Sequence, residues 1–178
     1  CDRMSKKQLL LQTAAQMIRE DGISQLSLER LATKAGITKA GVLYHFDSKA
    51  NLLRQMNELA IETFEKRITE HLSDGPYPFT RAYAQATLDD VDHGDMDLVA
   101  VFISSQEDAT SESIWSDVST GWNERFTADG PDQDAILKLR LLCDGFWFAV
   151  LYGYSESFKD RAATLIREAC DELVQGGS

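Results

Sequence analysis

The sequence predicts an all-α protein of about nine helices, divided into a small N-terminal domain and a larger C-terminal domain. Three observations predict this class. Apolar residues recur at helical spacing in nearly every segment. Short breaks rich in glycine, proline and aspartate separate these segments, and alternating strand patterns or Asn-Gly hairpin turns are scarce. We expect the two domains to span residues 1–47 and 48–178.

Two helices open the chain. The first is expected over residues 5–21 and ends at Gly22, because glycine readily takes the backbone conformation found at a helix end. Ser27 is expected to cap a second, short helix that ends at Gly36. The inward-facing residues are expected to be Leu11, Ala14, Ala15 and Ile18 on the first helix and Leu28, Leu31, Ala32 and Ala35 on the second.

A third helix is expected from its cap at Thr38 to about His45. A fourth is expected from a cap at Asp47 or Ser48 to about Leu72. The apolar residues of the third segment are expected to be core: Val42, Leu43 and Phe46.

A break with one glycine and two prolines follows at residues 73–79. Five more segments then have helical patterns, and the one that starts at Gln133 is the longest apolar stretch of the chain. These segments are residues 79–91, 96–109, 111–128, 133–154 and 157–174.

The charge is distributed unevenly along the chain. The whole chain carries −11, but residues 1–50 hold eight basic and five acidic side chains, a net charge of +3. An acidic body is repelled by phosphate, so contact with nucleic acid is expected in the first 50 residues alone. A solvated acidic surface that is denser at one end is the alternative reading.

Other features of the composition narrow the class. Cys1, Cys143 and Cys170 are odd in number and widely spaced, which argues against a disulfide framework and favours a reducing, cytoplasmic setting. No membrane-spanning segment, signal peptide, metal site or cofactor is expected.

Two short helices around a glycine turn form a helix-turn-helix, whose second helix enters the DNA major groove with its N-terminal residues toward the bases. Lys39 can donate to guanine, Ala40 can contact a thymine methyl group, and Gly41 lets the backbone approach the bases. Thr38 can bind a phosphate at the helix N-terminus. The complete set of expected DNA-binding residues is Ser27, Thr38, Lys39, Ala40, Gly41, Tyr44, His45 and Lys49, with Tyr44, His45 and Lys49 on the phosphate backbone.

The stretch "ITKAGVLYHFDSKANLL", preceded by "SLERLATKAG", resembles the DNA-binding domain of the TetR family of one-component regulators. The resemblance covers about residues 5–55. In the commonest form of the signature the tyrosine lies three residues before the phenylalanine, where this chain has Leu43. Whether Tyr44 binds phosphate or faces a base edge is therefore open.

The resemblance implies a C-terminal domain that binds a small-molecule effector and forms a homodimer through the last two helices. A charge at Ala149 is then expected to disrupt the dimer, and Gly145 and Gly153 would permit close helix approach. The alternative is that the helix over 133–154 is the buried centre of a monomer. The residues expected to line the effector pocket are Phe102, Trp115, Trp122 and Trp147.

The function expected from these features is a ligand-responsive repressor, released from a palindromic double-stranded operator by a small molecule. A ligand-independent architectural or activating DNA-binding protein is the alternative, and a helical interaction module without DNA binding is another. An enzyme is disfavoured, because pairing His71 with Asp74, or His93 with Asp95, gives no ligand spacing or activated nucleophile.

Overall fold

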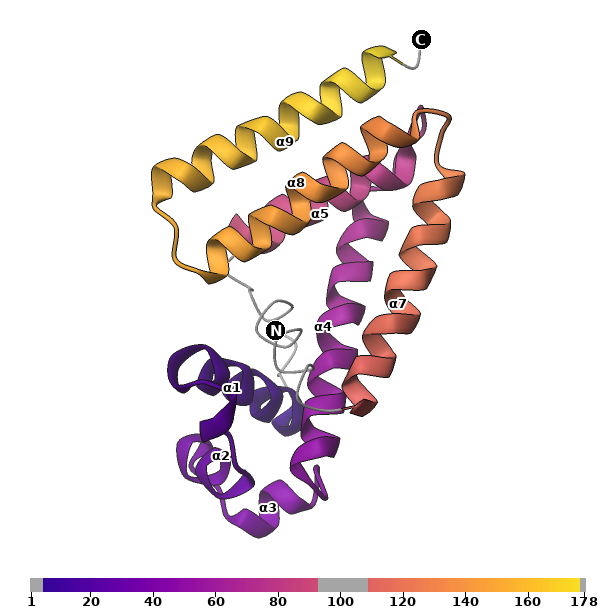
Figure 1. Ribbon diagram of the computed structural model, residues 1–178. Coiled ribbons are helices and arrows are strands. Elements are labelled where there is room, and N and C mark those ends of the chain that lie inside the picture. The colour runs from indigo at the N-terminus through magenta and orange to yellow at the C-terminus, as the bar shows by residue number, and fades with distance from the viewer. Residues whose placement is uncertain (1–4, 93–108, 177–178) are drawn as a thin grey trace. The chain divides into compact units, whose positions relative to one another are not determined.

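The computed structural model describes residues 5–92 and 109–176 (Figure 1). These residues form eight α-helices and one 3₁₀ turn, with no strand among them, which confirms the predicted all-α class. The helix expected over residues 96–109 lies almost wholly outside the described ranges.

The chain divides into two compact units, which are described separately. Among the described residues, the first unit holds 5–61 and 109–116, and the second holds 62–92 and 117–176. Helices α4 (Lys49–His71) and α7 (Ala109–Ala128) each contribute residues to both units. The predicted domain boundary between residues 47 and 48 stays a prediction.

The first unit is built from short helices whose ends are set by local caps. Ser5 and Gln8 form a reciprocal capping box at the start of α1, and Gly22 follows its end. Ser48 Oγ accepts a hydrogen bond from Asn51 N and so caps α4. The elements are α1 (Lys6–Asp21), η1 (Ile23–Gln25), α2 (Leu28–Ala35), α3 (Lys39–Leu43) and α4 (Lys49–His71).

The core of the first unit agrees with most of the predicted apolar faces, but Leu28 and Ala35 on α2 are only half-buried and Leu43 is exposed. The predicted stripe of α1 is buried, and so are Leu31, Ala32, Val42 and Phe46. Leu43 was predicted to be core, but its side chain is 42% exposed. Val42 and Phe46 both point inward, so Leu43, about 100° further round the helix, faces outward.

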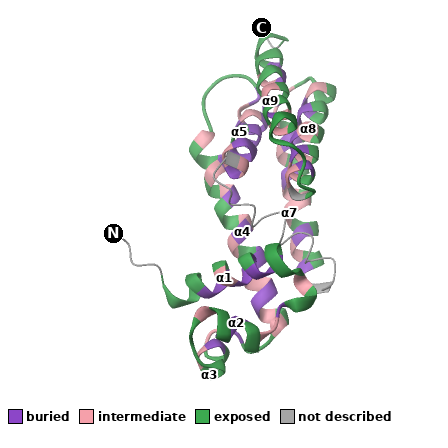
Figure 2. Cartoon of the chain, turned by 90° about the vertical axis from the view of Figure 1, so that its left-hand side faces the viewer, coloured by how far each residue is buried: buried purple, intermediate pink, exposed green. Residues whose placement is uncertain are grey.

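The second unit contains α5 (Pro78–Asp92), α8 (Gln133–Leu151), α9 (Glu156–Gly176) and the ends of α4 and α7 (Ala109–Ala128). Helices α8 and α9 run side by side in opposite directions (Figure 1). Buried residues follow α5 and α8, whereas much of α9 is exposed (Figure 2).

The N-terminal end of α5 is capped by the side chain of Asp129, which lies about 50 residues later in the chain. The Asp129 carboxylate accepts hydrogen bonds from Phe79 N at 2.9 Å and from Thr80 N at 2.8 Å. These amides belong to the first turn of α5 and have no carbonyl partner within that helix, so Asp129 satisfies them.

Candidate DNA-binding face and effector site

The turn between α2 and α3 follows from its residues. Gly36 has φ of 69°, in the left-handed region that glycine adopts without steric cost, and its N–H closes the end of α2. Thr38 Oγ1 then accepts from Gly41 N at 3.1 Å and starts α3, as Ser27 Oγ starts α2 by accepting from Arg30 N. These three caps confirm the predicted local structure of the helix-turn-helix.

One side of α3 is buried in the first unit, and the other side is exposed. Val42 and Phe46 are completely buried, whereas Thr38, Lys39 and Ala40 are exposed. Tyr44 is 85% exposed, and its ring meets that of His45 edge to face at 5.0 Å. Six of the eight residues predicted to bind DNA lie in or next to α3, four at its N-terminal end and two just after its C-terminal end. These six are Thr38, Lys39, Ala40, Gly41, Tyr44 and His45.

The glycine in α3 is not required by packing inside the chain. A Cβ at Gly41 would lie 3.4 Å from both Ile37 Cδ1 and Thr38 Oγ1, which are ordinary contact distances. Packing among the described residues therefore leaves room for a methyl group at this position.

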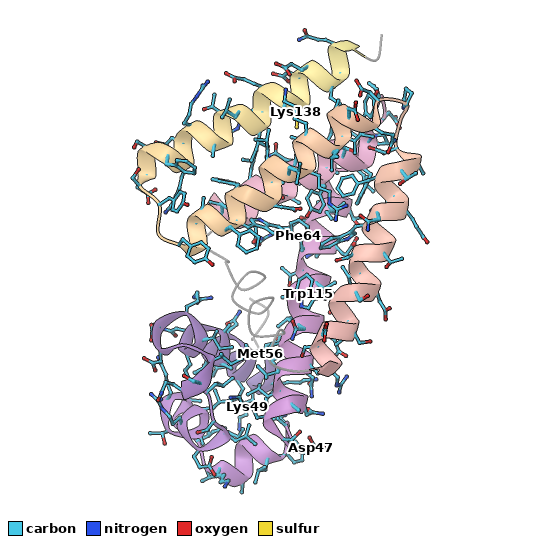
Figure 3. The ribbon with its side chains drawn as sticks, in the orientation of Figure 1. Asp47, Lys49, Met56, Phe64, Trp115 and Lys138 are labelled. Carbon is cyan, nitrogen blue, oxygen red and sulfur yellow. The ribbon has the colours of Figure 1, made fainter. Side chains whose placement is uncertain are left out.

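Two of the predicted basic residues are engaged within the first unit. Lys49 is half-buried, and its Nζ donates to Ile23 O at 3.1 Å, so it supports the η1 turn (Figure 3). Lys39 Nζ pairs with the Glu29 carboxylate, and that hydrogen bond holds the Glu29 pKa below its usual range. Sequence reasoning missed Glu29, because only the fold brings the start of α2 beside the start of α3.

The structure describes three of the four residues predicted to line an effector pocket. Trp122 and Trp147 lie in the second unit, and Phe102 is outside the described residues. Trp115 belongs to the first unit, where its Nε1 donates to Asn57 Oδ1 at 2.6 Å (Figure 3). Asn57 also donates to Ser111 Oγ and to Leu53 O, so Trp115 is part of a buried polar network.

Trp122 and Trp147 belong to an aromatic cluster in the second unit. Both rings pack on Phe64, which Figure 3 labels, with centroids 5.6 and 5.0 Å away. Both also pack on Tyr83, at 5.5 and 6.2 Å. Edge-on contacts of this kind are favourable for aromatic rings. The aromatic cluster consists of Phe64, Phe79, Tyr83, Trp122, Phe126 and Trp147.

Charged groups at the edge of the aromatic cluster are paired. Glu65 accepts from Trp122 Nε1 at 2.5 Å and from Arg125 at 2.8 Å. Asp144 accepts from Tyr83 Oη at 3.2 Å and has Arg140 Nε at 3.8 Å. Burial raises the Asp144 pKa above its usual range, against the opposing effects of Arg140 and Tyr83.

One polar atom of the aromatic cluster is unsatisfied. Trp147 Nε1 is buried, and no acceptor for it exists in the described part of the chain. A buried N–H without an acceptor is costly for the folded protein.

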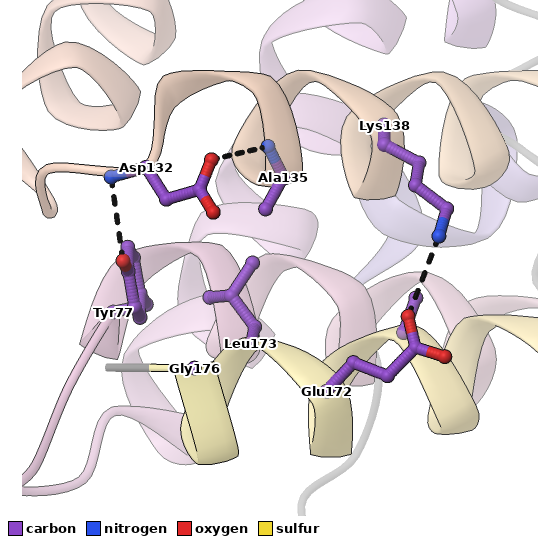
Figure 4. Close-up of a pocket in the computed structure, with 8 residues that line it drawn as sticks. Tyr77, Asp132, Ala135, Lys138, Glu172, Leu173 and Gly176 are labelled. Atoms are coloured by element: carbon purple, nitrogen blue, oxygen red, sulfur yellow. Dashed lines mark hydrogen bonds and ion pairs between the residues drawn. The ribbon is translucent and has the colours of Figure 1, made fainter. Parts of the chain in front are cut away.

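A separate surface pocket of about 190 Å³ lies between the start of α8 and the end of α9 (Figure 4). Lys138 Nζ and Glu172 form an ion pair at 3.3 Å across it, and Tyr77 Oη accepts from Asp132 N. Sequence reasoning did not anticipate this pocket, because its lining comes from three distant segments. The lining residues are Tyr77, Asp132, Ala135, Lys138, Ala169, Glu172, Leu173 and Gly176.

One of the two candidate acid–base pairs lies within the described residues, and its histidine contacts a different carboxylate from the one expected. His71 Nε2 contacts Asp89 Oδ2 at 2.6 Å, so Asp89 rather than Asp74 is its partner. His93 and Asp95 lie outside the described residues. Within the helices that the structure describes, no stretch is long and apolar enough to cross a membrane.

Helices α1, α2 and α3 share a buried core and leave the N-terminal end of α3 exposed, which is the arrangement of a helix-turn-helix protein. Residues 10–56 match the family described as bacterial regulatory proteins, tetR family. Residues 78–171, more than half of the chain, match the Tetracyclin repressor-like, C-terminal domain. The chain belongs to the TetR family.

The probable acrEF/envCD operon repressor of Escherichia coli strain K12 is a curated relative. It is 28% identical over 74 residues, which are 42% of this chain and 33% of the relative. The matched part of the chain thus spans about a third of the length of that relative.

Solved structures share the fold over nearly the whole chain. A putative TetR-family transcriptional regulator from Rhodococcus sp. has a TM-score of 0.73 at 15% identity, covering 94% of this chain and 98% of that one. The ketosteroid transcriptional regulator KstR2 of Mycobacterium tuberculosis has a TM-score of 0.68 at 16% identity, covering 98% and 96%. At these identities the likeness concerns the fold alone.

Proposed function

We propose that this protein is a ligand-responsive transcriptional regulator that acts in the cytoplasm as a repressor on a palindromic operator. The observation that carries the proposal is the exposed N-terminal end of α3, held in place by buried Val42 and Phe46. Thr38, Lys39, Ala40 and Gly41 are positioned there to meet base edges and adjacent phosphates.

A homodimer is part of the proposal, because a palindromic operator requires two-fold symmetry. Helix α8 carries an exposed apolar stripe that nothing within the described chain covers. At its middle is Gly145, where an added Cβ would meet open space. The stripe consists of Leu137, Leu141, Gly145, Phe148 and Tyr152, and Phe158 and Leu165 on α9 are also exposed.

Ala149 does not belong to this surface. Its side chain is only 5% exposed inside the second unit, so the expected effect of a charge at Ala149 would be unfolding rather than dissociation. The apolar stripe on α8 supplies the better test position, Leu141, which is 61% exposed.

We propose that the effector binds at the aromatic cluster, next to its member Trp147. An apolar site with a few polar groups is the usual form of a small-molecule pocket. The unpartnered Trp147 Nε1 favours an effector with a hydrogen-bond acceptor, such as a carbonyl or ether oxygen. Phe102 and Trp115 stay predictions as further lining residues.

Two matched substitutions test the effector site. Both substitutions remove the same part of an indole ring from the aromatic cluster, but Trp147→Phe removes an N–H that has no partner in the described chain, whereas Trp122→Phe also removes the hydrogen bond to Glu65. Trp122→Phe is therefore expected to cost about 1 kcal/mol more stability than Trp147→Phe, and Trp147→Phe is expected to lose affinity for the effector. Equal loss of stability in both variants would contradict the proposed role of Trp147.

Regulation requires that the effector bind one arrangement of the DNA-binding heads better than another. The heads of a dimer must present their α3 helices about 34–36 Å apart to enter successive major grooves. Because α4 contributes residues to both units, a small tilt of α4 is the proposed route from effector to DNA.

The experiment is a pair of titrations on a duplex selected from a random pool. Anisotropy measures operator binding with and without effector, and tryptophan fluorescence measures effector binding with and without operator. Coupling of about 1–3 kcal/mol between the two sites would weaken operator binding and effector binding by the same factor, roughly 5- to 150-fold. If the effector binds but changes neither the operator affinity nor, in the reverse titration, its own affinity in the presence of operator, the protein is a ligand-independent DNA-binding protein instead.

A further inference from the structure

The basic side chains around the predicted DNA-binding face are bound to acceptors of the first unit itself. Each of these four cations comes from α2, α3 or the start of α4. The pairs are Arg30 with Asp21, Lys34 with Glu20, Lys39 with Glu29, and Lys49 with the carbonyl of Ile23.

The pair of Glu29 and Lys39 differs from the others in its position. Lys39 is the first residue of α3, and Glu29 lies in the first turn of α2, two residues after its cap Ser27. The Glu29 side chain is 61% exposed and the Lys39 side chain is 53% exposed, so DNA at the N-terminal end of α3 would reach both. The hydrogen bond from Lys39 also keeps the Glu29 pKa low, so the carboxylate is ionised at neutral pH.

We propose that Glu29 is a specificity-determining residue for DNA binding, because it holds the Lys39 ammonium in a position suited to a guanine edge and unsuited to phosphate. This inference rests on the proposed function. A lysine ammonium has three donors, so Lys39 can keep one on Glu29 and offer the others to guanine O6 and N7.

A phosphate is a poorer partner for the same ion pair. A guanine edge carries no net charge, but a phosphate brings a negative charge beside the Glu29 carboxylate and is repelled by it. Lys39 would have to leave Glu29 to neutralise the phosphate and release its counterion, which is the main source of non-specific affinity. Glu29 therefore suppresses non-specific binding more than it weakens binding to a site with guanine under Lys39.

The test is Glu29→Gln, which removes the charge and keeps the size. Anisotropy titrations at several salt concentrations compare a duplex selected by the unmodified protein with a random duplex. Affinity for random DNA is expected to rise roughly three- to fivefold, since an exposed ion pair holds Lys39 only weakly. Its salt slope should steepen by about one ion, and affinity for the selected duplex should change less than about twofold.

Glu20→Gln is the matched control. Glu20 pairs with Lys34 in the same unit, so this variant changes the net charge by the same amount but leaves Lys39 on Glu29. It is expected to raise affinity for both duplexes by the same small factor. Circular dichroism checks that both variants keep the helical fold.

Three results would overturn the inference. If the two variants shift both duplexes alike, Glu29 contributes only net charge. If Glu29→Gln weakens the selected duplex and leaves random DNA unchanged, Glu29 itself contacts the site. If the unmodified protein binds neither duplex, the proposed function fails, and the inference fails with it.

Discussion

Replacing Gly41 with alanine should change stability and DNA affinity in opposite directions. Glycine in a helix is less favourable than alanine by about 0.5–1 kcal/mol, because the unfolded chain loses more freedom. The new Cβ would lie 3.4 Å from Ile37 Cδ1 and Thr38 Oγ1, and Ile37 is 38% exposed, so it has room to shift. The melting temperature is therefore expected to rise by about 1–4 °C for a chain of this size.

The same methyl group stands where the backbone of α3 is proposed to approach the bases. We expect Gly41→Ala to weaken binding to the selected duplex by at least about tenfold, or about 1.4 kcal/mol. Anisotropy titration measures this loss, and thermal unfolding followed by circular dichroism measures the gain in stability.

Gly121→Ala is the control for this prediction. Gly121 lies inside α7, in the second unit, and a Cβ there would meet nothing within 4 Å. This variant should gain similar stability and keep its DNA affinity. If Gly41→Ala binds the selected duplex as tightly as the unmodified protein does, the close approach of the α3 backbone is refuted.

Three further substitutions test other parts of the structure. Leu141→Arg adds a charge to the exposed α8 stripe, so sedimentation should report folded monomers with weakened operator binding; a folded dimer would contradict the proposed interface. Lys49→Met removes the hydrogen bond to Ile23 O and should lower stability by about 1 kcal/mol in thermal melts. If the melting temperature is unchanged and binding to all DNA is weaker, Lys49 contacts phosphate and does not stabilise the fold. Asp144 has a raised pKa from burial, so its stabilising effect is present below its unfolded pKa of about 4 and is lost as pH rises through the folded value. Asp144→Asn should therefore be the more stable protein at neutral pH. The difference should close as pH falls through the raised folded pKa and be gone below about 4, and a constant difference from neutral pH to about 4 would refute the cause.

Local structure could be predicted where neighbouring residues determine it. Ser27, Gly36 and Thr38 act within one helical turn of their own positions, so the order and spacing of residues were enough to place them. Leu43 was mistaken for core because α3 is too short for a periodic pattern to distinguish two adjacent apolar residues.

Partnerships between distant segments could not be predicted in the same way. Trp115 and Trp122 are seven residues apart on α7 and share one face, yet Asn57 binds the first and Glu65 the second. The ion pair of Glu29 with Lys39 likewise depends on how α2 and α3 pack. Helical periodicity identifies a buried face, but it does not identify the side chain from another helix that contacts it.

The cap on α5 has a consequence for how the protein is made. During synthesis the amides of Phe79 and Thr80 leave the ribosome about 50 residues before Asp129, the side chain that accepts their hydrogen bonds. Until then the first turn of α5 has only water as a partner, and an isolated helix of this length is marginal in water. The second unit should therefore acquire its structure late in translation, after the loop between α7 and α8 has emerged. Ribosome-bound chains that end before residue 129 should therefore be more sensitive to protease around α5 than the full-length chain.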